Sequence, residues 1–245
     1  MMNIQQGIRA TLLAGVALAL ASCSQQIRGG EAVQSEVYVL VDLSSTWFNA
    51  ESEQRNRRLL SSVGQGAGLM ATEIPTPYLV QYRVIGDNSY LREPICSAVY
   101  EPGFRRKGDD SERISRPRDL QAYLSGTCVQ GILSRSPEPL TQISAAVASV
   151  ALEPRPSEKG RRYVVIISDF LEESVSAAPI PDGGLSGVKV LLLYRPLAED
   201  QLSPTGTSAR VEQWRALLQA RGAAVEISPD TSVRASQIVS FLNND

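Results

Sequence analysis

Uninterrupted apolar runs alternate along this chain with segments in which apolar residues recur every three or four positions. Such runs predict strands that are buried on both faces, and they occupy residues 37–41, 163–168 and, broken only by Lys189, 188–194. A further short strand is predicted at 223–227. The helical spacing predicts helices, and its apolar positions lie within residues 59–70, 120–124, 143–150, 211–218 and 235–242. Strands that alternate with helices predict a doubly wound α/β fold, with a mostly parallel central sheet and helices on both faces.

One stretch of the chain has the pattern of a hairpin rather than of a buried parallel strand. Residues 78–85 alternate between apolar and polar side chains, and a Gly-Asp-Asn turn leads to a second short strand at 97–100. We therefore expect one antiparallel edge strand. Residues 101–118 carry mixed charge together with Gly and Pro, which is typical of a solvated loop, although a binding patch is the alternative.

The first predicted helix has a clear beginning and a weak second half. Asn49 can cap it, and acidic residues occupy its first turn. Gly64, Gly66 and Gly68 lie in its second half, and each glycine costs about 1 kcal/mol relative to alanine inside a helix.

Residues 1–22 are predicted to be an export signal rather than part of the fold. Arg9 precedes the apolar run 10–21, which is shorter than the ~20 residues of a membrane span and suits the core of a signal peptide. The run ends Leu-Ala-Ser-Cys, which resembles the bacterial lipobox. That resemblance implies cleavage before Cys23 and a lipid on its thiol, whereas a plain secretory signal is the alternative.

Lipidation at Cys23 implies a firm membrane anchor, because each buried methylene of an acyl chain contributes ~0.8 kcal/mol. The residue after this cysteine is Ser24 rather than an aspartate. In Gram-negative lipoproteins, which this segment resembles, a residue other than Asp at this position implies sorting to the outer membrane, facing the periplasm. Residues 23–35 are polar and contain a Gly-Gly pair, so they are predicted to be a flexible tether. Residues 36–245 are predicted to form one domain.

Composition excludes several classes of function. The 245 residues contain no histidine, which excludes Ser-His-Asp and Cys-His catalysis and histidine-ligated zinc. The 24 basic and 26 acidic residues give a formal net charge of −2, which argues against a nucleic-acid binder.

Cys96 and Cys128 are the two cysteines outside the predicted lipobox. Thiols of an exported chain tend to oxidise, so we predict a disulfide between them; two free buried thiols are the alternative. Closing a loop of about 33 residues corresponds to ~3.7 kcal/mol in the chain-entropy treatment.

Hydroxyl and carboxylate side chains follow the predicted strands. Asp42, Ser44 and Thr46 come directly after the first strand, Asp169 follows a later one, and Thr141 precedes a helix. Ligands of an open α/β sheet bind outside the carboxyl ends of its strands. Oxygen-only ligands suit Mg²⁺ or another hard cation such as Mn²⁺ or Ca²⁺. The alternative is that Asp42 and Ser44 only cap the turn that follows them.

The spacing Asp42-x-Ser44-x-Thr46 with a later Ser-Asp pair resembles the metal-ion-dependent adhesion site (MIDAS) of von Willebrand factor A (vWA) domains. That family has Asp-x-Ser-x-Ser after its first strand, a threonine in a second loop and an aspartate in a third. Thr46 keeps the hydroxyl of the final serine. The glycine that usually precedes the second-loop threonine is absent before Thr141, and Phe170 replaces the glycine common after the third-loop aspartate. The latter change allows another conformation of the third loop.

The resemblance extends over residues 36–242 and implies a binding module rather than an enzyme. Ser44 and Thr46 would bind the ion directly, and Asp42, Thr141 and Asp169 directly or through water. The open coordination position would accept a carboxylate from a partner protein of the cell envelope.

Neighbouring residues have two interpretations each. Trp47 and Phe48 either form an aromatic contact for the partner or pack beneath the loop. Glu172 and Glu173 either add negative potential at the rim or begin a helix.

Two other functions compete with metal-bridged binding. One is a metal-free vWA scaffold within an envelope complex. The other is a metal-dependent phosphohydrolase with Asp42 as nucleophile, since a strand that ends in Asp resembles haloacid-dehalogenase-type phosphatases. Those enzymes have Asp-x-Asp-x-Thr, however, and Ser44 removes the expected acid/base carboxylate.

Overall fold

The computed structural model describes residues 33–49, 52–73, 76–105, 112–155, 160–173, 179–195 and 206–243, all within a compact unit that spans Glu31–Asp245. The predicted signal 1–22, the lipidation site Cys23 and most of the tether lie outside the described residues. The last predicted tether residues belong to the folded part, since Val33 is buried and Ser35 begins the first strand. Within the described ranges, every helix is too short or too polar to cross a membrane.

A seven-stranded sheet forms the centre of this unit, in the order β4-β3-β2-β1-β5-β6-β7. Every neighbouring pair is parallel except β2 and β3. The strands are β1 (Ser35–Asp42), β2 (Tyr78–Ile85), β3 (Cys96–Tyr100), β4 (Arg113–Ile114), β5 (Arg161–Ile167), β6 (Val188–Tyr194) and β7 (Ala224–Pro229). The predicted α/β class with a mostly parallel sheet is confirmed. The expected antiparallel edge strand, β3, does pair antiparallel with β2, but it lies one position inside the edge because β4 pairs with it in parallel.

The prediction of a loop over residues 101–118 needs one correction, because β4 lies inside this segment. Val99 N donates to Glu112 O and Glu101 N to Ile114 O, at 2.8 and 3.0 Å. An ion pair of 3.0 Å between Arg113 and Glu101 fixes the short strand from the side. Its two residues are too few for a periodic pattern in the sequence.

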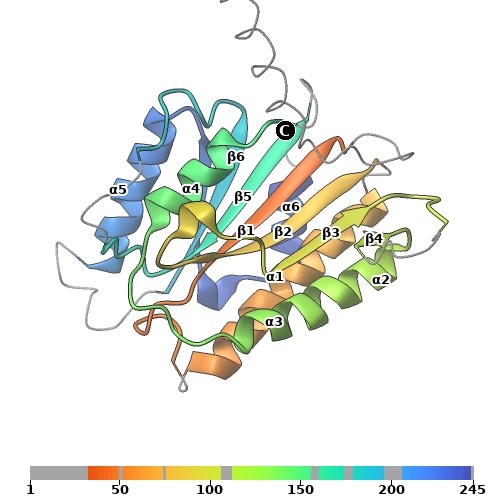
Figure 1. Ribbon diagram of the computed structural model, residues 1–245, viewed down its shortest axis with the longest axis horizontal. Coiled ribbons are helices and arrows are strands. Elements are labelled where there is room, and N and C mark those ends of the chain that lie inside the picture. The colour runs from red at the N-terminus through yellow and green to blue at the C-terminus, as the bar shows by residue number, and fades with distance from the viewer. Residues whose placement is uncertain are drawn as a thin grey trace, which may run out of the picture. The chain divides into compact units, whose positions relative to one another are not determined.

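Helices cover both faces of the sheet (Figure 1). One face carries α1 (Glu53–Glu73), α6 (Ala235–Asn243) and a continuous helical stretch made of α2 (Pro117–Ala122), the π-helical η3 (Tyr123–Cys128) and α3 (Val129–Leu133). The other face carries α4 (Ile143–Leu152) and α5 (Thr207–Ala220). Two short 3₁₀ turns, η2 (Ser89–Leu91) and η5 (Asp230–Ser232), complete the described elements.

Helix α1 is unbroken across the glycines that weaken its prediction from sequence. A Cβ on Gly64 would lie 2.8 Å from the Leu124 backbone, and one on Gly66 would lie 2.5 Å from the Ile238 side chain. The glycines therefore let η3 and α6 approach α1 more closely than any larger residue would allow. Tertiary packing offsets their low helix propensity.

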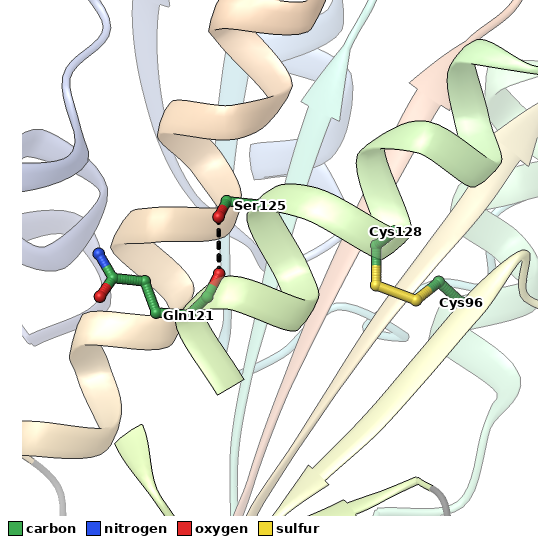
Figure 2. The surroundings of a disulfide bond; sticks show 4 residues. All are labelled: Cys96, Gln121, Ser125 and Cys128. Atoms are coloured by element: carbon green, nitrogen blue, oxygen red, sulfur yellow. Dashed lines mark hydrogen bonds between the residues drawn. A yellow bond between two sulfur atoms is a disulfide. The ribbon is translucent and has the colours of Figure 1, made fainter. Parts of the chain in front are cut away.

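The predicted disulfide is present and joins β3 to the end of η3 (Figure 2). Cys96 and Cys128 have Cα atoms 5.4 Å apart. Within the helical stretch, Ser125 Oγ donates to the carbonyl oxygen of Gln121 at 2.7 Å. The disulfide therefore fixes this helical stretch to β3.

Loss of the disulfide is expected to lower the free energy of unfolding by about 3.7 kcal/mol, because the unfolded chain regains the entropy of a loop of about 33 residues. Denaturant unfolding of the Cys96→Ala/Cys128→Ala variant, compared with the oxidised protein, measures this difference. Two alkylatable thiols in the unreduced, unfolded protein would contradict the bond itself.

Candidate metal site

Three connections meet at the carboxyl edge of the parallel strands, at the lower left of Figure 1. The first connection follows β1, and its Ser44 forms an isolated parallel bridge with Glu138 in the connection before α4. Glu138 N also donates to Leu43 O at 2.8 Å. The third connection follows β5, and its Glu173 N donates to Thr141 O at 3.0 Å. Residues more than 120 positions apart therefore share one edge.

A chain of short hydrogen bonds links the predicted ligands of the first and third connections. Ser44 Oγ lies 3.0 Å from Thr46 Oγ1, and Thr46 Oγ1 donates to Asp169 Oδ2 at 2.8 Å. Asp169 Oδ1 accepts from the Leu171 backbone N–H at 2.9 Å. Thr46 is exposed whereas Ser44 and Asp169 are buried. The oxygens of these three residues therefore form a contiguous group that opens to solvent at Thr46.

Asp42 lies beneath this group and is fully buried. Its Oδ1 accepts from Ser44 N at 2.8 Å and its Oδ2 from Ser168 Oγ at 2.6 Å. Burial raises the pKa of the Asp42 carboxyl to about 6, and the hydrogen bonds from Ser168 and Ser44 oppose this shift. Ser168 is thus a further member of the site, which the sequence indicated only as the neighbour of Asp169.

Thr141 lies in the second connection, the one before α4, and is buried at the same edge. Its carbonyl oxygen accepts from Glu173 N and so joins the second connection to the third. Glu172 accepts from Ser144 N and Ser144 Oγ, at 3.0 and 3.2 Å. It therefore caps the first turn of α4 from a different connection. The interpretation that Glu172 begins a helix is wrong, since residues 171–173 are not helical.

The third connection places Phe170 in a backbone conformation that favours glycine. Phe170 has a φ of 61°, in the left-handed region, and its N donates to Ser168 Oγ at 2.9 Å. Its ring is buried and its carbonyl oxygen accepts from Trp214 Nε1 at 3.3 Å. Side-chain burial and this bond hold a conformation that costs a non-glycine residue about 1 kcal/mol or more.

Trp47 and Phe48 pack beneath the first connection, because both are buried. The alternative in which they form an exposed contact for a partner is therefore wrong. The Trp47 carbonyl oxygen accepts from Ser52 Oγ at 3.0 Å and Asn56 Nδ2 at 3.3 Å. The Arg195 guanidinium lies 4.3 Å from the centre of the Trp47 ring. Sequence patterns gave no signal for this support.

Arg195 is itself held by two partners, since it donates to Asn56 Oδ1 at 2.6 Å and to Asp230 Oδ2 at 3.2 Å. Asp230 also pairs with Arg55. The buried Arg195 guanidinium, at the end of β6, therefore joins the first connection to α1 and to η5. The three residues come from segments far apart in the sequence, which is why no local motif marks them.

The donor set fits a small hard cation. Oxygen ligands in adjacent positions of a magnesium octahedron lie about 3 Å apart, because each is about 2.1 Å from the ion. The Ser44–Thr46 and Thr46–Asp169 separations of 3.0 and 2.8 Å match this spacing. The described part of the chain contains no cluster of three or more His, Cys, Asp or Glu side chains suited to a metal. A cation held here would therefore depend on hydroxyls beside two carboxylates.

Comparisons with known proteins find similar solved structures of low sequence identity. No family model matches the chain, and no curated protein matches it. Similar solved structures include an aerotolerance-related membrane protein from Bacteroides fragilis, with 16% identity, a TM-score of 0.46, and 85% of this chain and 98% of that one covered. A von Willebrand factor type A protein from Catenulispora acidiphila has 10% identity and a TM-score of 0.47, with 87% and 44% covered.

A third similar structure is proximal thread matrix protein 1 from the mussel byssus, with a zinc-occupied MIDAS motif. It has 14% identity and a TM-score of 0.45, with 86% of this chain and 46% of that chain covered. At this identity the likeness concerns the fold alone. The chemistry of the carboxyl edge must be judged from the side chains themselves.

Proposed function

We propose that this chain is a binding module that holds a divalent cation, Mg²⁺ by preference, and uses it to bind a carboxylate of a partner protein. Ser44, Thr46 and Asp169 would hold the cation at the rim, the buried Asp42 would act on it through water, and Thr141 would lie beside them. The observation that carries the proposal is the contiguous group of Ser44, Thr46 and Asp169 oxygens, spaced at 3.0 and 2.8 Å. A bound cation supplies an electrophile for an anionic group, and the chain positions it at the rim.

We further propose that the module acts at the bacterial cell envelope. The predicted lipobox and Cys23 support anchoring to a membrane, with the outer membrane indicated by Ser24. Mass spectrometry of the N-terminus from untreated and globomycin-treated producing cells tests this anchor, because globomycin blocks the signal peptidase that cleaves before a lipidated cysteine. We expect a cleaved chain that begins with lipidated Cys23 in untreated cells and an uncleaved precursor in treated cells. An unlipidated Cys23 in untreated cells would contradict the anchor.

The surroundings of Asp42 disfavour the phosphohydrolase. A nucleophilic carboxylate needs an oxygen that can reach a substrate. Both Asp42 oxygens already accept hydrogen bonds, from Ser44 N and Ser168 Oγ, and the side chain is fully buried. Turnover of a generic phosphate ester that disappears in Asp42→Asn would favour the phosphohydrolase over the binding module.

Isothermal titration with Mg²⁺ and Mn²⁺ tests the metal site, and capture of partners from membranes with and without chelator tests its use. We expect saturable metal binding, and partner capture that is lost in chelator. Absence of heat and of any melting shift at millimolar metal would favour the metal-free scaffold. Capture that persists in chelator would contradict the metal bridge.

Metal affinity is expected to fall as pH falls through 6, since protonation of Asp42 removes a carboxylate beside the cation. Burial raises the pKa of this carboxyl to about 6. At pH 5 about one molecule in ten is then ionised, which corresponds to an affinity roughly tenfold lower than at pH 7.5. Titrations across this range measure the change. An affinity that is constant between pH 5 and 7.5 would show that ionisation of Asp42 is not needed.

A further inference from the structure

In the part of the chain that the structure describes, most of the large exposed apolar side chains lie at the carboxyl edge of the sheet, which also holds the candidate metal site. Among the described residues, the large apolar side chains left exposed are Tyr90, Leu91, Leu140, Leu152, Leu171 and Leu217. Four of them lie on the connections at the carboxyl edge, whereas Leu152 and Leu217 lie on α4 and α5. Exposed apolar residues that gather at one place indicate an interaction surface, while single scattered ones do not.

Leu140 and Leu171 lie in the two connections that carry Thr141 and Asp169. Leu140 directly precedes Thr141 and is 39% exposed; Leu171 is 38% exposed. Leu171 N donates to Asp169 Oδ1 at 2.9 Å, which fixes its position relative to that carboxylate. The bond between Glu173 N and Thr141 O keeps the two connections together.

Leu91 is 80% exposed. It belongs to η2, which follows β2 and packs against α4. Its neighbour Arg92 donates to Glu138 Oε2 at 2.9 Å, and Glu138 forms the bridge with Ser44. Since β2 and β5 flank β1 in the sheet, Leu91 and Leu171 follow strands on opposite sides of the metal motif.

We propose that the partner segment carries an Asp or Glu with large apolar residues close to it on both sides. The apolar residues pack on Leu91 and on the Leu140–Leu171 pair while the carboxylate reaches the cation. This inference rests on the proposed function and specifies its partner. A purely polar acidic segment would leave the exposed leucines in water and gain nothing from them.

Three capped peptides test the proposal by titration calorimetry on the full chain in saturating Mg²⁺. The first has one glutamate between two leucines, the second has serines in place of those leucines, and the third has glutamine in place of the glutamate. We expect the first to bind about tenfold more tightly than the second, since it buries two apolar side chains. The third is expected not to bind.

Matched variants locate the contact. Leu91→Ser and Leu171→Ser are each expected to weaken binding of the leucine peptide about fivefold and to leave the serine peptide unchanged. Leu152→Ser removes a leucine that is 54% exposed on α4 and is expected to change neither affinity.

Equal affinities for the leucine and serine peptides would overturn the proposal, as would a loss in Leu152→Ser as large as in Leu91→Ser. Binding of neither peptide while Mg²⁺ still titrates would also overturn it and leave the metal site intact. A separate Mg²⁺ titration without peptide distinguishes these results from failure of the proposed function, in which no metal binds.

Discussion

Replacing Thr46 with valine is expected to weaken Mg²⁺ binding by at least about tenfold, since changes near a metal commonly cost 10–100-fold in affinity. Thr46 Oγ1 lies between Ser44 Oγ and Asp169 Oδ2, at 3.0 and 2.8 Å, so it is the central oxygen of the group. Valine keeps the branched shape and removes only the hydroxyl. Because Thr46 Oγ1 donates to the buried Asp169 carboxylate, the free energy of unfolding is also expected to fall, by about 1 kcal/mol.

Ser45→Ala is the matched control for this variant. Ser45 is also exposed and lies in the same connection, but it occupies the position between the two hydroxyl ligands of the motif. Its loss is expected to leave Mg²⁺ affinity unchanged. If Thr46→Val bound Mg²⁺ as the unmodified chain does, the hydroxyl group at the rim would not be the cation site and the metal-free scaffold would be favoured.

The fold was predictable because long apolar runs and helical spacing repeat along the chain. The run 37–41 marked β1 because both faces of that strand are covered, and every residue of β1 is buried. The sequence motif then placed Asp42, Ser44 and Thr46 at the carboxyl end of β1 by the topology of parallel sheets alone. The short strand β4 was missed because two residues carry no period.

The support of the site was not predictable, because it depends on contacts between distant residues. Phe170 keeps the left-handed backbone of a glycine only because its ring is buried and Trp214 bonds its carbonyl oxygen. Trp47 packs beneath its loop because Arg195, 148 positions later, covers its ring. A pattern within a few residues cannot report such interactions.

Replacing Arg162 with methionine is expected to lower the free energy of unfolding by about 3–5 kcal/mol, because it leaves a buried carboxylate without its partner. Arg162 on β5 lies directly across from Glu36 on β1, and its Nε donates to Glu36 Oε2 at 2.8 Å. Both residues are buried. The guanidinium also donates to the carbonyl oxygens of Val150, Glu153 and Pro154, at 2.7, 3.0 and 3.0 Å. These bonds satisfy carbonyl oxygens in the last turn of α4 and directly after it, so their loss lowers the free energy of unfolding further.

The double variant Glu36→Leu/Arg162→Met separates the two contributions. Removing both charges eliminates the unpaired carboxylate, so we expect part of the lost stability to return, while the unsatisfied carbonyl oxygens at the end of α4 keep the remainder. Denaturant unfolding of both variants measures this difference, and a double variant no more stable than Arg162→Met would show that the orphan charge is not the cause. Because the pair lies at the amino end of β1, opposite Asp42, the folded fraction of either variant is expected to bind Mg²⁺ with unchanged affinity.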